Sequence, residues 1–251
     1  MQRRHVGTRS ACATAAVLGK KWGREWYAGG AMAAEIEIKL RIGEPKRFLK
    51  TLAKVGAKAV AGRVHEMNLL FDTPDGGLAK HGQLLRIRTE TPAAVKGTRK
   101  TKKKVKATGD GAGERYLLTF KSPPEQMAIG PATPVADRRH KVREELETLL
   151  VDAEMVKRIF EGLGLRGWFR YEKYRTPYKF GAREKWAKNL VIDYDETPIG
   201  TFVELEGPPE AIDEAARRLG YGTREFITKN YLVLYLEDCR RREVTPAHML
   251  F

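Results

Sequence analysis

Charged and apolar residues alternate one by one from residue 34 to residue 42, and this alternation limits the fold more than any other feature of the chain. Glu35, Glu37 and Lys39 fall on one side of an extended backbone, and the residues between them are aliphatic. A repeat of two residues is typical of a β-strand whose two faces meet different surroundings. The segment therefore predicts a strand with one ionic face and one apolar face.

Further runs of this kind predict strands at residues 60–72, 83–89, 114–121, 141–147, 168–180, 185–195 and 200–206. Apolar spacing and capping residues predict helices at residues 45–55, 152–163, 209–219 and 228–239. Short turns join many of the strands, and few helices stand between them, which favours an antiparallel sheet over a βαβ arrangement. We therefore expect an α+β protein with about eight strands.

The ionic faces of these strands carry seven cations and seven anions, with almost no Ser, Asn or Gln among them. The cations are Lys39, Arg86, Arg88, Lys121, Arg143, Lys173 and Arg175; the anions are Glu35, Glu37, Glu145, Glu147, Asp193, Glu204 and Glu206. An open sheet with one solvent-exposed face would explain the charges on any single strand. Charges on so many strands instead favour a closed barrel whose lumen holds them, with the apolar faces turned outward against helices.

An eight-stranded barrel is wide enough to hold side chains or one small ligand. Removing ions from water costs several kcal/mol each unless they are paired or liganded, so leucines would serve stability better. A lumen of mixed charge suits a polyanion that arrives together with a divalent metal ion.

The net charge of +15 could indicate a nucleic-acid-binding protein, but its distribution argues against this. Residues 1–31 hold six cations and one anion, residues 95–106 hold seven cations and no anion, and the rest of the chain carries only +3. Two distant cysteines, Cys12 and Cys239, fit a reducing cytoplasm. No stretch approaches the roughly 20 apolar residues that span a bilayer, so we expect a cytoplasmic protein with no membrane partner.

Residues 1–33 are predicted to be a disordered or spurious extension, because Met32 would be a natural start just before the first strand. Residues 34–239 are predicted to form one domain, followed by a C-terminal tail at 240–251. The basic segment at 91–113 is predicted to be a loop inserted between two strands. This loop could steer polyanions, bind RNA or polyphosphate, or remain solvated.

An ordered set of motifs resembles the CYTH superfamily, also called triphosphate tunnel metalloenzymes. The set consists of ExExK at 35–39, Phe71-Asp72-Thr73-Pro74, Leu85-Arg86-Ile87-Arg88, Leu118-Thr119-Phe120-Lys121, RxExE at 143–147, Lys173-Tyr174-Arg175 and the run from Gly200 to Glu206. The resemblance covers about four-fifths of the chain and implies an eight-stranded antiparallel barrel, the triphosphate tunnel, with helices packed outside. The motif run looks closest to bacterial class IV adenylyl cyclases, although the 91–113 loop is longer than is usual in the family.

The resemblance also implies roles for the charged residues, which agree with their chemistry. Mg²⁺ or Mn²⁺ would be held by Glu35, Glu37, Glu204 and Glu206, with Glu145, Glu147 and Asp193 as further candidates. The phosphates would be bound by Lys39, Arg86, Arg88, Lys121, Arg143, Lys173 and Arg175, and Lys229 would close the far end of the ligand. Within this set, Lys39, Arg86, Arg88, Lys121 and Arg175 would offset charge at the reacting phosphorus.

Three functions stay open at this point. The chain could cyclise ATP to cyclic AMP and pyrophosphate, or it could hydrolyse tripolyphosphate, thiamine triphosphate or a nucleoside triphosphate. It could also be a non-catalytic module that binds polyphosphate or RNA ends. The register of the triphosphate along the tunnel decides between the first two, and the residues do not reveal it. A homodimer is a further open alternative.

Overall fold

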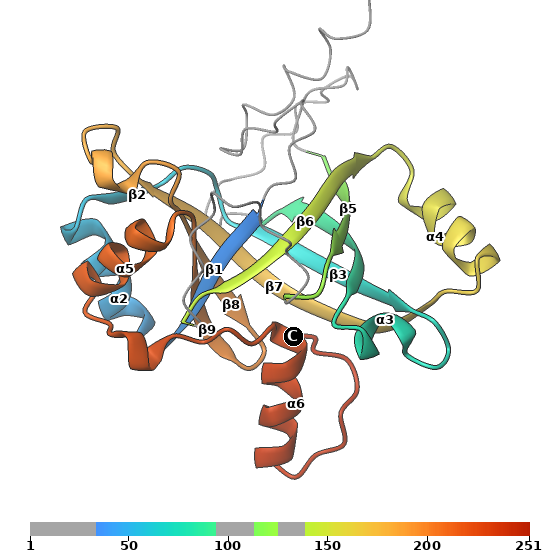
Figure 1. The fold of residues 1–251 in the computed structure, drawn as a ribbon. Helices are drawn as coiled ribbons and strands as arrows, with labels where there is room; N and C mark the ends of the chain where they lie inside the picture. Colours follow the sequence, from blue (N-terminus) through green and yellow to red (C-terminus); the bar gives the residue numbers. More distant parts are fainter. Residues whose placement is uncertain (1–33, 94–112, 125–138) are drawn as a thin grey trace, which may run out of the picture. The chain divides into compact units, whose positions relative to one another are not determined.

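The computed structural model describes residues 34–93, 113–124 and 139–251 (Figure 1). The predicted extension at 1–33 and most of the predicted basic loop lie outside these residues. The strands are β1 (Ala34–Ile42), β2 (Ala57–Ala59), β3 (Val64–Asp72), β4 (Leu84–Pro92), β5 (Arg115–Lys121), β6 (Lys141–Leu150), β7 (Arg166–Phe180), β8 (Val191–Thr197) and β9 (Gly200–Glu206). The helices are α2 (Pro45–Lys54), α3 (Gly77–Lys80), α4 (Ala153–Gly162), α5 (Pro209–Arg218) and α6 (Tyr231–Arg241), with short 3₁₀ turns at η2 (Lys185–Ala187) and η3 (Thr223–Glu225).

Eight of the strands form a closed antiparallel barrel, which confirms the predicted fold. Their order is β7-β3-β4-β5-β6-β1-β9-β8, and pairing of β8 with β7 closes the ring. The short strand β2 is additional and pairs only with the end of β7, where Ala57 lies opposite Phe180. Closure gives each of the eight strands a neighbour on both sides, so their inner faces enclose a lumen.

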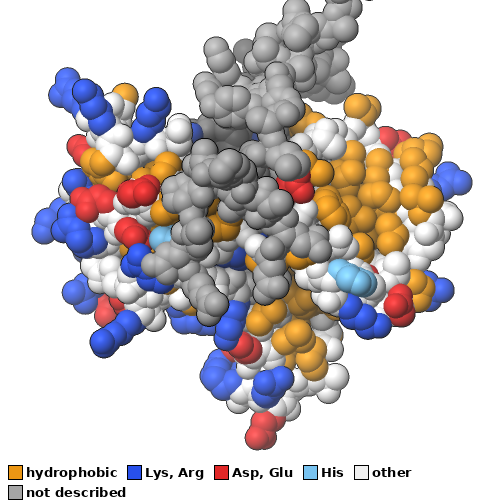
Figure 2. All heavy atoms as spheres, in the orientation of Figure 1, with side chains coloured by type: hydrophobic (Ala, Val, Ile, Leu, Met, Phe, Trp, Pro, Cys, Tyr) orange, Lys and Arg blue, Asp and Glu red, His pale blue; other side chains and the backbone are white. Residues whose placement is uncertain are grey.

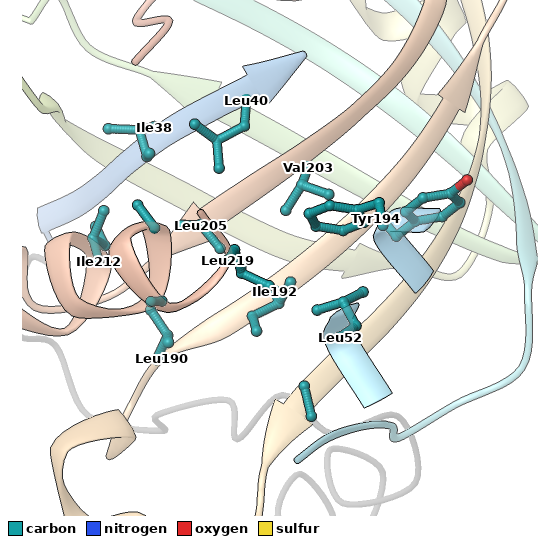
Figure 3. Packing of buried hydrophobic residues seen from close by; sticks show 14 of the residues in the cluster. Ile38, Leu40, Leu52, Leu190, Ile192, Tyr194, Val203, Leu205, Ile212 and Leu219 are labelled. Atoms are coloured by element: carbon teal, nitrogen blue, oxygen red, sulfur yellow. The ribbon is translucent and has the colours of Figure 1, made fainter. Parts of the chain in front are cut away.

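Helices α2 and α5 cover the outer face of β1, β8 and β9. The aliphatic residues that alternate with the charges of β1, such as Ile38 and Leu40, point into this layer and are fully buried (Figure 3). Helix α2 begins at Pro45, which is favoured in a first turn, and buries Phe48 and Leu52 one turn apart on the same side. The apolar half of the alternation therefore forms the main core outside the barrel.

Helix α4 covers the outer face of β3, β4 and β5 on the other side of the barrel. Asp152 caps it by accepting a hydrogen bond of 2.9 Å from the Met155 amide, as the acidic cap in the sequence predicts. Phe160 packs edge-on against Phe71, whereas Ile159 on the outer side of α4 is 51% exposed. Figure 2 shows hydrophobic side chains exposed on the face over β6 and α4.

Aromatic residues occupy the inner face at one end of the barrel, beside α6. Phe202 lies two residues before Glu204 on the inner face of β9. Phe202 and Tyr231 of α6 are both buried, with their rings in edge-on contact. The last residues, predicted to be a tail, return along β7, where the Met249 amide donates to the carbonyl of Arg170 over 3.0 Å. Met249 is 1% exposed, so this segment contributes to the same aromatic cluster.

Several predicted boundaries differ from the structure. The strand predicted at 60–72 begins only at Val64, and the one predicted at 185–195 begins only at Val191, because a 3₁₀ turn forms at Lys185–Ala187. The last helix begins at Tyr231 and not at 228, since Asn230 caps it. No helix in the described part of the chain is both long enough and apolar enough to cross a membrane.

Candidate functional site

The strand register places all fourteen predicted strand charges on the inner face of the barrel. Residues directly opposite each other on antiparallel strands point to the same face, so the register can be followed around the ring. Glu35 lies opposite Arg143, Lys39 opposite Glu204, and Glu204 opposite Asp193. Most of these side chains are buried in spite of their charge. The lumen is therefore an ionic interior, as the alternation predicts.

Lys39 lies between two carboxylates on neighbouring strands. Its Nζ is 3.2 Å from Glu37 Oε1 and 3.4 Å from Glu204 Oε1. Lys141 of β6 contacts the same Glu37 oxygen. Burial alone would raise the pKa of the Glu37 carboxyl, but Lys39 and Lys141 outweigh it and hold that pKa well below its usual range. Burial lowers the pKa of Lys141 to about 8 in spite of its contact with Glu37.

Lys121 joins a second pair of carboxylates. Its Nζ is 2.6 Å from Glu35 Oε2 and 3.2 Å from Glu145 Oε2. Burial raises the pKa of Glu35, Lys121 opposes this rise, and the neighbouring carboxylates of Glu37 and Glu145 add to it. At both lysines, one ammonium group thus stands where two carboxylates approach each other.

Arg175 is the centre of the largest ionic cluster. Its Nε and Nη2 donate to the two oxygens of Asp195 over 2.7 and 2.6 Å, and Nη1 donates to Asp193 over 2.6 Å. The same guanidinium contacts Glu204 and lies 3.6 Å from Glu66. The fork on Asp195 is the bidentate geometry in which arginine pairs most strongly with a carboxylate.

The wall formed by β3 and β4 carries the two arginines of the Leu-Arg-Ile-Arg motif. Arg88 lies 3.3 Å from both Glu90 and Glu147, and Arg86 donates to the hydroxyl of Tyr171 over 2.9 Å. The charges of Glu66, Glu147 and Glu90 outweigh the effect of burial and raise the pKa of Arg88 well above its usual value. Both arginine side chains lie on the inner face of β4 and point into the lumen.

Arg143 differs from the other lumen cations. It is 4% exposed, its Nε has no hydrogen-bond partner, and no ion pair joins its side chain to another residue in the described ranges. A buried guanidinium without a counter-ion is costly, so its presence favours an anionic ligand.

Lys229 lies outside the lumen, in contrast to the predicted role at the far end of the ligand. Its side chain is 51% exposed and its Nζ is 2.5 Å from Glu237 on the surface of α6. Tyr231 occupies the end of the lumen instead, because the bridge between Ile227 and Lys39 brings the start of α6 there. The Tyr231 hydroxyl donates to Asp195 over 2.7 Å, and its ring centroid lies 5.0 Å from Lys173 Nζ.

Sequence reasoning missed further residues of this interior, among them Glu66, Asn68, Lys141, Asp195 and Tyr231. Asp195 and Lys141 could have been found, since each lies two residues from a predicted lumen residue on the same strand. Glu66 and Asn68 precede the apolar run Leu69–Phe71, which hides the alternation. Nothing in the sequence distinguishes Tyr231 from a core residue of α6.

The carboxylates of β1 and β9 fit a hard divalent ion in their chemistry, since Mg²⁺ and Mn²⁺ prefer oxygen ligands. Glu37 lies directly opposite Glu206, and the Glu37 and Glu204 carboxylates are close enough for each to influence the other's ionisation. Among the described residues, however, no three Asp, Glu, His or Cys side chains converge on one point. Lysine ammonium groups occupy the spaces between the carboxylates, so metal binding would require them to move.

A closed antiparallel barrel with an ionic lumen and helices outside defines the class of this protein. The family model described as the CYTH domain matches residues 33–231. The chain belongs to the CYTH family, which confirms the resemblance read from the motifs.

Similar proteins agree with this assignment. A protein of Methanocaldococcus jannaschii, provisionally named as an adenylate cyclase, is 27% identical over 210 residues, which cover 80% of this chain and 97% of that protein. Adenylate cyclase CyaB of Aeromonas hydrophila is 24% identical over 204 residues, which cover 80% of this chain and 87% of the relative. A solved structure from Pyrococcus horikoshii superimposes with a TM-score of 0.58 at 21% identity, covering 81% of this chain and 99% of the other, and shares the fold.

Proposed function

We propose that this protein is a metal-dependent enzyme that binds a triphosphate in the barrel lumen and converts ATP to cyclic AMP and pyrophosphate. The observation that carries the proposal is the buried ionic lumen, in which Arg143 has no carboxylate partner among the described residues. A polyanion would supply the missing counter-charge. The names of the two curated relatives favour the cyclase reaction over hydrolysis.

The carboxylates Glu35, Glu37, Glu204 and Glu206 would hold Mg²⁺ or Mn²⁺, with Glu145, Glu147 and Asp193 as further candidates. When bound, the metal would supply Lewis-acid stabilisation of the phosphate oxygens. Arg86 and Arg88 on one wall and Arg143 on another would bind phosphate oxygens from different sides and fix the triphosphate in place. Buried charges of this kind act strongly, because little water is present to screen them.

In the cyclase reaction, the ribose 3′-hydroxyl attacks the α-phosphorus and pyrophosphate leaves. Negative charge then grows on the bridging oxygen of the leaving group. Lys39, Lys121 and Arg175 would offset this charge, and each neutralises carboxylates in the lumen. Hydrolysis of a terminal phosphate would use the same groups with water as the nucleophile, so it is the second candidate and an outcome of the test.

The test offers purified protein ATP and tripolyphosphate in parallel with Mn²⁺ or Mg²⁺. Cyclic AMP with pyrophosphate is the expected result, whereas orthophosphate release without cyclic AMP would replace the cyclase by a triphosphatase. Tight binding of both compounds without turnover would indicate a non-catalytic phosphate-binding module. Failure to bind either compound would refute the proposed site.

A further inference from the structure

Asn68 lies on the inner face of β3 and has no hydrogen-bond partner at either end of its amide within the described chain. Its side chain is fully buried, and its direct neighbours across the strands, Arg88 and Tyr171, also face the lumen. Buried polar side chains in folded proteins nearly always have partners. An amide that is open at both ends, inside a lumen, therefore points to a ligand group.

The groups around Asn68 are engaged elsewhere. Arg88 is directed to Glu90 and Glu147, and the hydroxyl of Tyr171 accepts a hydrogen bond from Arg86. The other buried atoms on this wall without a hydrogen bond are Nε of Arg86, Nε of Arg88 and one oxygen of Glu66, which lies 3.5 Å from Lys173 Nζ.

The chemistry of these open atoms separates a phosphate from an organic group. Ionised phosphate oxygens only accept hydrogen bonds, so they can pair with the two arginines and with the amide nitrogen of Asn68. They cannot pair with the amide oxygen, which needs a donor. A sugar hydroxyl or the edge of a nucleobase offers both a donor and an acceptor, and so can satisfy both ends of one amide.

The place of Asn68 in the lumen supports the same conclusion. On one side along β3 is Glu66, which belongs to the ionic cluster with Lys173 and Arg175. On the other side is Leu70, which belongs to the buried aromatic cluster with Tyr171. Asn68 thus lies at the border between ionic and apolar surfaces, which matches the border between phosphate and nucleoside in a nucleotide.

We infer that Asn68 recognises the nucleoside part of a nucleoside triphosphate, through a hydroxyl or base edge that bare tripolyphosphate lacks. This inference rests on the proposed function and adds to it a residue that recognises the nucleoside part of the substrate. Asn68 is a specificity-determining residue in this scheme and takes no part in the bond exchange.

The experiment compares wild-type protein with Asn68→Leu, and uses Met67→Leu, on the outer face of the same strand, as the matched control. Calorimetry with Mn²⁺ measures binding of α,β-methylene-ATP and of tripolyphosphate to each protein. We expect Asn68→Leu to weaken binding of the ATP analogue about tenfold and to change that of tripolyphosphate by less than about twofold. The melting temperature should not fall, since an unpartnered amide is replaced by an apolar group of similar size.

A second experiment uses only wild-type protein. It measures the affinity for GTP and for the 2′-deoxy and 3′-deoxy forms of ATP. A loss of about tenfold with one of them identifies the hydroxyl or base edge that Asn68 contacts. Equal affinity for all of them, or an Asn68→Leu variant that affects ATP and tripolyphosphate alike, would overturn the inference and leave the proposed function intact. If wild-type protein binds neither compound, both fail.

Discussion

Arg175 offers the sharpest test of the ionic interior, because four carboxylates surround it, three of them buried. The guanidinium forms a fork on Asp195, donates to Asp193 over 2.6 Å, contacts Glu204 and lies 3.6 Å from Glu66. Arg175→Met keeps most of the side-chain stem and removes the charge. Breaking a buried ion pair by deleting one partner costs about 3–5 kcal/mol, because the other charge is left uncompensated.

Neighbouring cations limit this loss. Lys173 remains 2.9 Å from Asp195, and Lys39 remains 3.4 Å from Glu204. We therefore expect Arg175→Met to lower the free energy of unfolding by about 3 kcal/mol, the lower end of this range. For a protein of this size each kcal/mol corresponds to about 2–4 °C, so the melting temperature should fall by about 6–12 °C.

The difference in the free energy of unfolding between wild type and Arg175→Met should also become smaller as the pH falls. Burial already raises the pKa of Asp195 in the folded protein, with Arg175 and Lys173 opposing the rise, so removal of Arg175 raises this pKa further. A carboxyl whose pKa is higher in the folded than in the unfolded state destabilises the fold above its folded pKa. This penalty disappears as the pH drops and the group is protonated.

The assay is urea unfolding of wild type and variant at pH 8 and pH 5, compared at each pH. Arg217→Met on α5 is the control, because its ion pair with Glu214 is exposed and should contribute little. A deficit below about 1 kcal/mol at pH 8, or one that is equal at the two pH values, would refute the view that Arg175 neutralises buried charge.

Three further substitutions test other parts of the lumen. Glu37→Gln should weaken Mn²⁺ binding in calorimetry at least tenfold and abolish turnover, with the fold kept by circular dichroism; unchanged Mn²⁺ affinity would remove Glu37 from the proposed ligands. Lys141→Met should strengthen Mn²⁺ binding several-fold, because Lys141 competes for the same Glu37 oxygen, and weaker binding would contradict that competition. Tyr231→Phe should cost about 1–2 kcal/mol in urea unfolding, because Asp195 loses a hydroxyl donor while the ring stays, and a neutral effect would show that this hydrogen bond is unimportant.

The barrel and the inner face of its strands could be predicted because each strand separates two surroundings. The alternation in Ala34–Ile42 assigns every side chain of β1 to the lumen or to the helical layer, and a slip of one residue would exchange them all. The strand at Gly200–Glu206 was predicted with the bounds that the structure has. A turn before this strand and the alternation of charged and apolar residues within it determine where the strand begins and ends.

Pairing between distant residues could not be predicted in the same way. Glu66 becomes a lumen residue only because β3 pairs with β7 in the register that sets it opposite Lys173. Tyr231 reaches the lumen only because residue 227 bridges to β1 before α6 begins. The sequence predicts Lys229 at the far end of the ligand, but its side chain lies at the surface beside Glu237.

The ion pairs of the lumen predict that metal and triphosphate bind together. Lys39 and Lys121 each join two carboxylates, so a metal ion alone would displace ammonium groups that then lack counter-ions. A triphosphate alone would take the cations and leave the carboxylates unpaired, which is equally costly. If both bound together, the metal would take the place of the lysines at the carboxylates, and the phosphates would accept the released lysines. By linkage, each ligand must raise the affinity of the other by the same factor, and calorimetric titrations in both orders measure it. Independent binding would show that the lysines do not move between the two partners.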